Sequence, residues 1–407
     1  MAAIIRAINR KIKALLKSFP CVVLIGARQV GKTTLLKQVL PAANYYDLEK
    51  ESDRRLVSAD LEYFLKSTPK PLIIDEAQLE PKLFNALRVS IDENRSSKGS
   101  FLLSGSSSPH LLKNISESLA GRVAIVEIPN LDWEEAFNLK EADFVKNIFK
   151  LEKLEKLKSE LSSENLLELC LKGTYPEPFL ERKNKFVYQT WYENYIKTYL
   201  ERDIRALFPT LKLDAYRRFI SMLAFSSGEI LNNAKLASAL DVSEPTIKNY
   251  LEIAEGTFLW RRLNPYCSNK KKSLIKSAKS YLRDTGLINY FLKIETKEQL
   301  LSHPNFGYIW EGFVLEQILK TMPRHHTNFD AYYYRTKNYL EVDLIIEAAD
   351  GIVPIEIKSG SVIDIKRLNH LKSFIEEYNC KYGILINNAD RLTMVSEKII
   401  QIPARFL

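Results

Sequence analysis

Paired cysteines and long apolar runs are both absent from this sequence of 407 residues. The four cysteines show none of the spacing of a zinc ribbon or a disulfide framework: they are Cys21, Cys170, Cys267 and Cys380. Residues 1–18 have the periodicity of an amphipathic helix interrupted by lysines and arginines, and no stretch reaches about 18 consecutive apolar residues. We therefore expect a reduced, cytoplasmic protein with neither a signal peptide nor a membrane-spanning helix.

The composition is that of a folded protein with an anionic partner. Apolar residues make up 46% of the chain and charged residues 27%, which is typical of globular rather than disordered proteins. Because this length exceeds one ordinary hydrophobic core, we expect roughly two to four domains. The formal net charge of +9 favours nucleic acid or an acidic membrane surface as the partner.

One stretch has the pattern of a phosphate-binding loop. The apolar run Val22–Ile25 has the length of a buried parallel strand, and the residues after it match G-x-x-x-x-G-K-[ST] in full. Glycines let backbone N–H groups turn toward a polyphosphate, and the helix that follows directs its positive end at the anion. The predicted nucleotide-binding residues are Gly26, Ala27, Arg28, Gln29, Val30, Gly31, Lys32, Thr33 and Thr34.

Two side chains of this loop have distinct predicted roles. Lys32 would contact the β- and γ-phosphates as a point charge, and the Thr33 hydroxyl would hold Mg²⁺. The strand before the loop and the apolar helix face after it are the context that the motif requires. We therefore predict nucleotide binding rather than a chance match of eight residues.

A second, acidic motif indicates hydrolysis. The aliphatic run Leu72–Ile74 is followed by Asp75 and Glu76. Asp75 would hold Mg²⁺ beside Thr33, and Glu76 would polarise the attacking water. The alternative, a strand followed by an ordinary acidic turn, is weak because the pair follows a complete phosphate loop.

A serine cluster and one arginine are weaker candidates for the nucleotide site. An apolar strand from residue 100 ends in a serine cluster in which Ser104, Ser106 or Ser107 could sense the γ-phosphate, although a serine-rich turn explains the cluster nearly as well. Arg122 ends a helical segment, and its planar guanidinium suits a developing phosphate charge. A lone arginine is more often a member of a surface ion pair.

Four stretches together resemble the prokaryotic ATPases of the AAA+ superfamily that carry an uncharacterised conserved C-terminal domain: GARQVGKTTLL, LIIDEAQ, LLSGSSS and SLAGRV. The matching residues are Lys32 and Thr33 for the Walker A motif, Asp75 and Glu76 for Walker B, Ser104–Ser108 for sensor 1 and Arg122 for the family's conserved arginine. The resemblance implies ATP rather than GTP as the nucleotide and Mg²⁺ as its metal. It also implies catalytic roles for Glu76, Ser104 and Arg122.

The resemblance extends into residues 131–210, which we expect to form a helical connector or lid. Gly173-x-Tyr175-Pro176 and the segment 191–205 match the family, whereas a lysine- and glutamate-rich insertion near 141–168 departs from it. The insertion is predicted to be a solvated helix or pair of helices. Apolar residues from Trp191 onward share one helical face, which is more often core than a binding site. The charges of 201–205 indicate an ion-pair hinge rather than catalysis.

Residues 211–300 have the pattern of a winged helix. Two helices are predicted at Ala234–Leu240 and Glu244–Ala254, separated by a turn with helix-capping residues. The second helix exposes polar residues of the types that meet base edges and phosphates: Thr246, Lys248 and Asn249.

A basic segment follows these helices. Eight basic residues and no acidic one lie between Phe258 and Arg283, with Lys270–Lys272 at the tip of a predicted hairpin. This charge favours DNA as a partner. A module that docks another protein is the alternative, because a fold by itself does not establish DNA contact.

A third pattern of charged residues lies within 301–407. Asp343 is on one predicted strand, Asp350-Gly351 suits a hairpin turn, and Glu356 and Lys358 project from one face of the next strand. With Glu311 on an upstream helix, this set resembles the PD-(D/E)xK restriction-endonuclease-like fold. Asp343 and Glu356 would hold Mg²⁺, and Lys358 would orient or activate water. The alternative is a hairpin with outward charges, but the surroundings are apolar, where unpaired charges are costly.

The predicted architecture is an α/β protein of four parts: a P-loop ATPase domain with a parallel sheet (1–130), the helical connector (131–210), the winged helix (211–300) and a nuclease-like α/β domain (301–407). The leading hypothesis is an ATPase that acts on nucleic acid, with a metal-dependent nuclease site that is either active or relic. The alternative is an ATP-dependent regulatory switch that binds DNA or a protein and cuts nothing. DNA is the predicted partner, a membrane is not, and a homo-oligomer or protein partner stays open.

Overall fold

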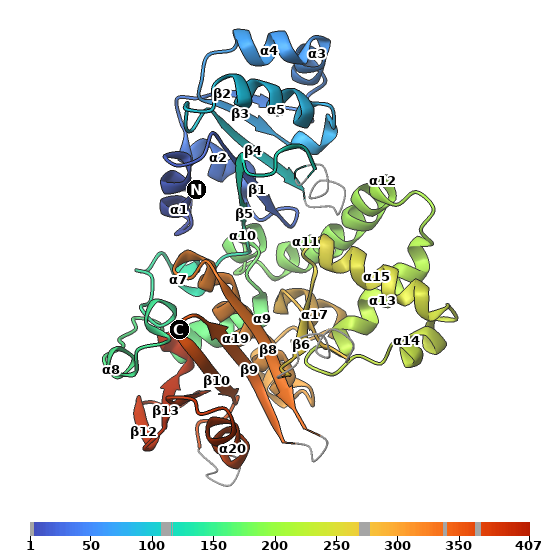
Figure 1. The fold of residues 1–407 in the computed structure, drawn as a ribbon. Coiled ribbons are helices and arrows are strands. Elements are labelled where there is room, and N and C mark those ends of the chain that lie inside the picture. Colours follow the sequence, from blue (N-terminus) through green and yellow to red (C-terminus); the bar gives the residue numbers. More distant parts are fainter. Residues whose placement is uncertain (1–3, 107–114, 116, 268–276, 337–339, 363–367) are drawn as a thin grey trace. The chain divides into compact units, whose positions relative to one another are not determined.

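The computed structural model describes residues 4–106, 115, 117–267, 277–336, 340–362 and 368–407 (Figure 1). The chain divides into two compact units. The first consists of Met1–Leu131 with Glu252–Leu259, and the second of Asp132–Leu251 with Trp260–Leu407. The finer partition of residues 131–407 into three domains stays a prediction.

The first unit is built on a five-stranded parallel sheet. Its strands are β1 (Cys21–Gly26), β2 (Asn44–Asp47), β3 (Leu72–Asp75), β4 (Phe101–Ser106) and β5 (Val123–Glu127). Their order is β2-β3-β4-β1-β5, and every neighbouring pair runs parallel. All residues of β1 are buried, as expected for a central parallel strand covered on both faces. The predicted strands are confirmed, and β4 lies between the phosphate-loop strand β1 and the acidic strand β3.

Helices of the first unit pack on this sheet. They include α1 (Asn9–Leu16), α2 (Lys32–Val39), α3 (Glu51–Ala59), α4 (Leu61–Ser67) and α5 (Leu83–Glu93). Leu83, Phe84 and Leu87 of α5 belong to the same apolar core as the strand residues Val23 and Ile25. The alternate residues of β1 face away from that core and are buried as well, so apolar contacts cover both faces of the sheet.

Two helices of this unit are separated by a single residue. The chain breaks at Asp60 between α3 and α4. Asp60 has an extended backbone conformation, and its carboxylate accepts a hydrogen bond from the Tyr63 N–H at 2.9 Å. Aspartate caps the start of a helix better than it continues one, which is the physical reason for the break.

Helices form much of the second unit before its sheet begins. They include α7 (Trp133–Phe137), α8 (Leu151–Leu154), α9 (Ser163–Lys172), α10 (Pro176–Leu180), α11 (Lys185–Thr198), α12 (Arg205–Leu207), α13 (Leu213–Phe225) and α14 (Asn233–Leu240). Helix α15 (Glu244–Gly256) begins in the second unit, and its residues from Glu252 onward belong to the first. The two helices predicted around residue 242 are thus confirmed as α14 and α15. The charged insertion is less solvated than expected, because Leu154, Leu157 and Leu161 are buried.

The segment that follows Trp191 forms core, as predicted. Beyond α11 the chain continues as a π-helix, Tyr199–Ile204, before α12. Tyr195, Ile196, Tyr199 and Leu200 are each at most 5% exposed. π-Helical turns are rare and often mark functional positions, so the charges of 201–205 stay a predicted hinge.

Two hydrogen bonds of Tyr192 explain the glycine of the motif Gly173-x-Tyr175-Pro176. The Tyr192 hydroxyl donates hydrogen bonds to Asp284 Oδ1 at 2.9 Å and to the Lys172 carbonyl at 3.0 Å. Gly173 has a φ of +77°, and a Cβ atom there would lie 2.4 Å from the Tyr192 hydroxyl oxygen. Any side chain at this position would therefore push Tyr192 away from Asp284.

The second unit also contains an eight-stranded sheet. Its strands are β6 (Trp260–Pro265), β7 (Lys279–Leu282), β8 (Phe329–Arg335), β9 (Glu341–Ala348), β10 (Gly351–Ile357), β11 (Gly383–Asn387), β12 (Thr393–Ser396) and β13 (Ile399–Pro403). The order is β12-β13-β11-β10-β9-β8-β6-β7. Helices α17 (Thr285–Leu292), α18 (Lys297–Ser302), α19 (Phe306–Thr321) and α20 (Asn369–Glu377) complete the unit.

The hairpin expected to be a wing belongs to this sheet. β6 pairs with β7 in antiparallel fashion and with β8 in parallel fashion, through Asn264 opposite Tyr332. Its predicted tip, Lys270–Lys272, lies outside the described residues. The hairpin therefore continues the same sheet as the strands that carry Asp343 and Glu356.

Among the residues that the structure describes, none of the helices has both the length and the apolar character that crossing a membrane demands.

Candidate functional site

The phosphate loop connects β1 to α2 in a backbone conformation that favours glycine. Gly31, which precedes α2, has a φ of +89°, and Gln29 within the loop has a φ of 61°. A Cβ atom on Gly26 would lie 2.4 Å from the carbonyl oxygen of Ile128, the residue after β5, so only glycine fits here. Left-handed non-glycine residues are uncommon and cluster at functional sites. Gln29 is one of two such residues beside this loop.

Lys32 lies inside the curve of the loop. Its ammonium donates hydrogen bonds to the carbonyl oxygens of Gly26 at 3.1 Å and Ala27 at 2.9 Å, and the side chain is buried. Carbonyl oxygens of this kind hold an ammonium where the oxygens of a polyphosphate could replace them. The position agrees with the role predicted for Lys32.

Asp75 receives side-chain hydrogen bonds from two neighbouring strands, β2 and β4, and from the start of α2. The Thr33 hydroxyl donates to Asp75 Oδ2 at 2.7 Å, and the Tyr45 hydroxyl donates to the same oxygen at 2.8 Å. The Ser104 hydroxyl donates to Asp75 Oδ1. The arrangement depends on the strand order, because β4 brings Ser104 between the ends of β1 and β3. Residues from both predicted motifs therefore meet at one carboxylate.

Tyr45 was missed by the sequence interpretation. It lies on β2 opposite Ile73, so its contact with Asp75 depends on the pairing of two strands. The pKa of the Tyr45 phenol is raised, mainly by burial and next by the hydrogen bond to Asp75. The hydroxyl therefore keeps its proton and remains a hydrogen-bond donor. The Lys37 ammonium lies 4.5 Å from the centre of the Tyr45 ring. No sequence signal beyond a predicted strand marked this residue.

Glu76 has the second left-handed backbone of the site. Its φ of 54° and ψ of 44° turn the chain sharply at the end of β3. The Glu76 N–H donates to Ser104 Oγ at 3.2 Å, and the Gln78 amide donates to the Glu76 carboxylate. A strained backbone of this kind persists only where surrounding contacts stabilise it. Here those contacts fix the position of the Glu76 carboxylate.

One member of the serine cluster, Ser104, contacts the acidic motif. Ser104 is fully buried against Asp75. Ser107 and Ser108 lie outside the described residues, as does the side chain of Ser106. The γ-phosphate-sensing role of Ser104 stays a prediction that this position supports.

Arg122 pairs with an acidic residue of its own unit. Its guanidinium makes two hydrogen bonds to the Asp92 carboxylate, from Nε at 2.8 Å and from one terminal nitrogen at 2.7 Å. This bidentate pair is the ion-pair alternative that the sequence left open. A catalytic role for Arg122 requires exchange of Asp92 for a phosphate, and it stays a prediction.

The residues present fit a Mg²⁺ ion bound with a nucleotide. Thr33 Oγ1 and Asp75 Oδ2 are oxygen atoms in direct contact, and magnesium prefers oxygen ligands with several waters retained. Their side chains face the loop in which Lys32 lies. Thr33 and Asp75 would hold the ion, as the sequence predicts.

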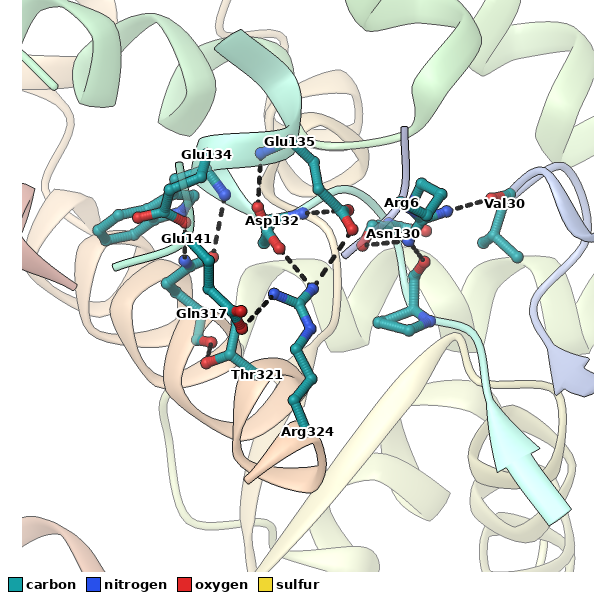
Figure 2. Close-up of polar contacts among 12 residues, drawn as sticks. Arg6, Val30, Asn130, Asp132, Glu134, Glu135, Glu141, Gln317, Thr321 and Arg324 are labelled. Carbon is teal, nitrogen blue, oxygen red and sulfur yellow. Dashed lines mark hydrogen bonds and ion pairs between the residues drawn. The ribbon is translucent and has the colours of Figure 1, made fainter. Parts of the chain in front are cut away.

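Arg6 connects the phosphate loop to the segment after β5 (Figure 2). One terminal nitrogen donates to the Val30 carbonyl at 2.8 Å, and the other donates to the carbonyls of Pro129 at 2.7 Å and Asn130 at 3.3 Å. The arginine is 5% exposed, although it belongs to the segment expected to be amphipathic. Sequence periodicity placed Arg6 on the polar side of a helix, and only the fold shows that it contacts the loop.

A second polar cluster lies around Arg324 in the second unit (Figure 2). Asp132 caps α7 together with Glu135, and the Arg324 guanidinium pairs with both carboxylates and with Glu141 at 3.3 Å. Burial, followed by the charge of Asp132, raises the pKa of nearby Glu134 to about 8. Arg324 thus compensates the charges of Asp132, Glu135 and Glu141 within the second unit.

The carboxylates predicted for the C-terminal site do meet, and an unexpected lysine lies among them. Glu311 comes from α19, Asp343 from β9 and Glu356 from β10. The Lys279 ammonium, from β7, is 2.9 Å from Glu311 Oε1, 2.6 Å from Glu341 Oε1 and 3.8 Å from Asp343 Oδ1. We call these residues, together with Lys358, the carboxylate cluster.

Lys358 contacts the other side of the carboxylate cluster. Its ammonium is 2.6 Å from Glu356 Oε1 and 3.3 Å from Asp343 Oδ2, which also accepts the Ile357 N–H at 2.8 Å. The other oxygen, Glu356 Oε2, is buried and has no hydrogen-bond partner among the described residues. Burial and then the charge of Asp343 raise the pKa of Glu356 to about 8.

Lys279 is a cation in this environment. Burial alone would lower its pKa, but Tyr281, Glu311 and Asp343 outweigh burial and raise the pKa above its ordinary value. Within the part of the chain that the structure describes, no three or more histidine, cysteine, aspartate or glutamate side chains are arranged to hold a metal ion. A divalent ion therefore does not fit the carboxylate cluster in this arrangement, and metal binding by Asp343 and Glu356 stays a prediction.

The basic segment is less available to DNA than its composition indicated. Four of its eight basic residues are described: Arg261, Arg262, Lys279 and Arg283. Arg261 and Arg283 both pair with the buried Glu316, and Lys279 pairs within the carboxylate cluster. These three side chains neutralise internal carboxylates, which corrects the expectation that the whole segment faces a nucleic acid. Lys248 and Asn249 of α15 are exposed, as predicted.

Comparison with known proteins places this geometry in a family. An AAA domain matches residues 18–137, and two domains of unknown function, DUF8612 and DUF4143, match residues 163–298 and 306–407. The solved Walker-type ATPase PABY2304 of Pyrococcus abyssi is similar at 16% identity and a TM-score of 0.44, over 70% of this chain and 94% of that chain.

The relatives found by sequence include two uncharacterized proteins. The uncharacterized protein MJ1544 of Methanocaldococcus jannaschii is 26% identical over 84% of this chain and 75% of its own length. The uncharacterized protein Rv2008c of Mycobacterium tuberculosis is 32% identical over 97% of this chain and 82% of its own length. Because that identity extends over nearly the whole chain, the protein belongs to the family of Rv2008c, with an AAA-type ATPase domain at residues 18–137.

Proposed function

We propose that this protein hydrolyses ATP and that the hydrolysis cycle changes how its second unit engages nucleic acid. The observation that carries the proposal is the convergence on Asp75 of Thr33 from the phosphate loop and Ser104 from β4. A site built only to bind nucleotide has no need of an acidic strand end next to a sensing hydroxyl. Glu76 follows Asp75 directly, in a backbone conformation fixed by the same contacts.

Each residue of the site has a separate task in hydrolysis. The loop N–H groups and Lys32 bind the phosphates, and Thr33 and Asp75 hold Mg²⁺, which withdraws charge from the phosphate oxygens when it is bound. Glu76 orients and polarises the attacking water. Ser104 connects the position of Asp75 to the backbone of Glu76 through two hydrogen bonds. Arg122 would act on the phosphates only after it leaves Asp92.

Support for nucleic acid as the partner comes from charge and from α15. The net charge of +9 favours an anionic partner, and Lys248 and Asn249 are exposed on the second helix of a helix-turn-helix pair. Thr246, at the start of the same helix, is hydrogen-bonded to Ser243. Helices of this kind present their first residues to a major groove.

The second candidate function is an ATP-dependent regulatory switch that binds DNA or a protein and cuts nothing. Lys279 favours it over cleavage, because its ammonium already neutralises Glu311 and Glu341. A nuclease of the PD-(D/E)xK type requires carboxylates that are free to hold metal.

One set of assays tests both functions. Purified protein is assayed for ATP turnover, with Glu76→Gln as the control, and for cleavage of supercoiled and linear DNA in Mg²⁺ or Mn²⁺. Turnover that is lost in Glu76→Gln and stimulated by DNA supports the proposal. Turnover that is unchanged by the substitution contradicts it. Metal-dependent cleavage that is lost in Asp343→Ala would overturn the non-cleaving switch.

A further inference from the structure

We infer that Lys279 is the resident cation of the carboxylate cluster, occupying with its ammonium the position that a divalent metal ion would take, so that the native chain does not bind such an ion there. The inference deepens the second candidate function, because a cluster closed by its own lysine can retain its shape without cleaving. It concerns only groups within the second unit.

The first support is the arrangement of ligands around the Lys279 nitrogen. Carboxylate oxygens of Glu311, Glu341 and Asp343 approach it from α19 and from two positions of β9. Anionic oxygen donors, here from one helix and one strand, are the ligand type that a hard divalent ion uses. An ammonium meets the same donors with a single charge and at longer distances.

The second support is the charge within the carboxylate cluster. Glu311, Asp343 and Glu356 face the ammonium groups of Lys279 and Lys358, and Glu341 at the edge is shared with Arg335 at 3.8 Å. Removing the charge of Lys279 leaves the buried carboxylates of Glu311 and Asp343 without the cation that they share. Buried carboxylates that lack a compensating cation are costly.

The third support is independent of the lysine. Glu356 is 5% exposed, and its buried Oε2 atom has no hydrogen-bond partner among the described residues. A buried carboxylate oxygen without a donor is uncommon. It shows that the cluster has more acceptor oxygen atoms than its two lysines satisfy.

The fold explains how a lysine reaches this position. Lys279 is the first residue of β7, which pairs with β6 opposite Leu263, and β6 in turn pairs with β8. The hairpin expected to be a separate wing thus delivers a cation to residues of β9 and α19. Lys279 Nζ also lies 5.9 Å from the centre of the Tyr333 ring, which closes one side of the site.

The experiment measures Mn²⁺ binding by the full-length protein without nucleotide, using electron paramagnetic resonance and calorimetry. Variants are Lys279→Met and Lys279→Gln, with Lys279→Arg as the charge-conserving control and Lys279→Met/Asp343→Asn to remove a proposed ligand. We expect one Mn²⁺ bound at least tenfold more tightly by the Met and Gln variants than by the wild type. The Arg variant and the double variant should resemble the wild type.

The outcomes are decisive in either direction. Wild-type protein that binds Mn²⁺ as tightly as Lys279→Met, with loss in Asp343→Asn, would overturn the inference, as would folded neutral variants that bind none. If the neutral variants unfold, refolding on addition of Mn²⁺ supports the inference and failure to refold counts against it, because an ion that binds the folded state stabilises it. Since neither ATP nor DNA is present, failure here would leave the proposed ATPase function intact.

Discussion

The hydroxyl of Thr33 donates a 2.7 Å hydrogen bond to Asp75 Oδ2, although 42 residues separate the two in the chain. Thr33 is the second residue of α2, and Asp75 ends β3, which is not a neighbour of β1 in the sheet. The contact forms because parallel strands present their carboxyl ends at one edge. It makes the two motifs a single site whose parts can be tested separately.

Lys32→Ala and Glu76→Gln should separate nucleotide binding from turnover. Loss of the ammonium inside the loop removes charge that complements the phosphates, so Lys32→Ala should abolish measurable ATP binding. Glu76→Gln should bind ATP normally and turn it over about 10²–10³-fold more slowly, the typical effect of losing one preorganised catalytic group. Fluorescent-nucleotide titration and phosphate release measure the two effects. Normal turnover by Glu76→Gln would refute the assigned role.

Tyr45→Phe should impair catalysis without unfolding the protein. The substitution keeps the ring beneath Lys37 but removes the hydrogen bond to Asp75, whose net contribution to stability is typically about 1 kcal/mol. We expect a severalfold lower kcat and a higher Mg²⁺ requirement, measured by steady-state ATPase assays. Tyr46→Phe is the matched control, because the Tyr46 ring packs on Phe64 and is not among the Asp75 contacts. Equal effects of both substitutions would argue against a special role for Tyr45.

Arg6→Ala should weaken nucleotide binding from outside the motif. Without the guanidinium, the Val30 carbonyl of the loop loses its link to Pro129 and Asn130. Loss of a buried charged donor leaves acceptors unsatisfied at a cost of about 1–3 kcal/mol, which we expect to appear in ATP affinity and in melting temperature. Arg10→Ala, at an exposed position of the same segment, is the control. An unchanged affinity for ATP in Arg6→Ala would limit the residue to a structural role.

Gly173→Ala should destabilise the second unit. The added methyl would lie 2.4 Å from the Tyr192 hydroxyl and 2.5 Å from Asp284 Oδ1, at a φ of +77° that alanine rarely adopts. Overpacking and backbone strain of this kind cost about 1–3 kcal/mol. Gly360→Ala is the control, since a Cβ there meets nothing within 4 Å. Thermal unfolding measures both, and equal melting temperatures would contradict the close packing.

Lys248→Glu should weaken DNA binding and its dependence on salt. Each phosphate that a protein neutralises contributes roughly 0.9 to the slope of log K against log salt, so the variant should lose about that much. Lys381→Glu makes the same charge change at another exposed position and serves as the control. Fluorescence anisotropy with duplex DNA over a salt series gives both slopes. If both variants lose affinity equally, only the net charge acts and α15 has no specific role.

The sequence by itself determined the elements whose signals are local. The phosphate loop was predicted residue by residue, because glycine at 26 and 31 is required by a close approach and by a left-handed backbone at those positions. Strands β1, β3 and β4 were predicted because buried parallel strands are short runs of aliphatic residues. The meeting of Asp343, Glu356 and Lys358 was also predicted, since a hairpin turn and a two-residue period place them by local geometry.

The tertiary structure alone decided which partners the charged side chains have. Tyr45, Arg6 and Lys279 lie on segments for which the sequence predicted secondary structure. The residues to which they are hydrogen-bonded are, respectively, 30, 24 and 32 positions away in the chain. From the sequence, a lysine on a basic hairpin is expected to be a surface charge. Lys279 lies in the carboxylate cluster because β6 pairs with β8. Such contacts depend on strand order and register, which arise from packing over the whole unit rather than from any local pattern.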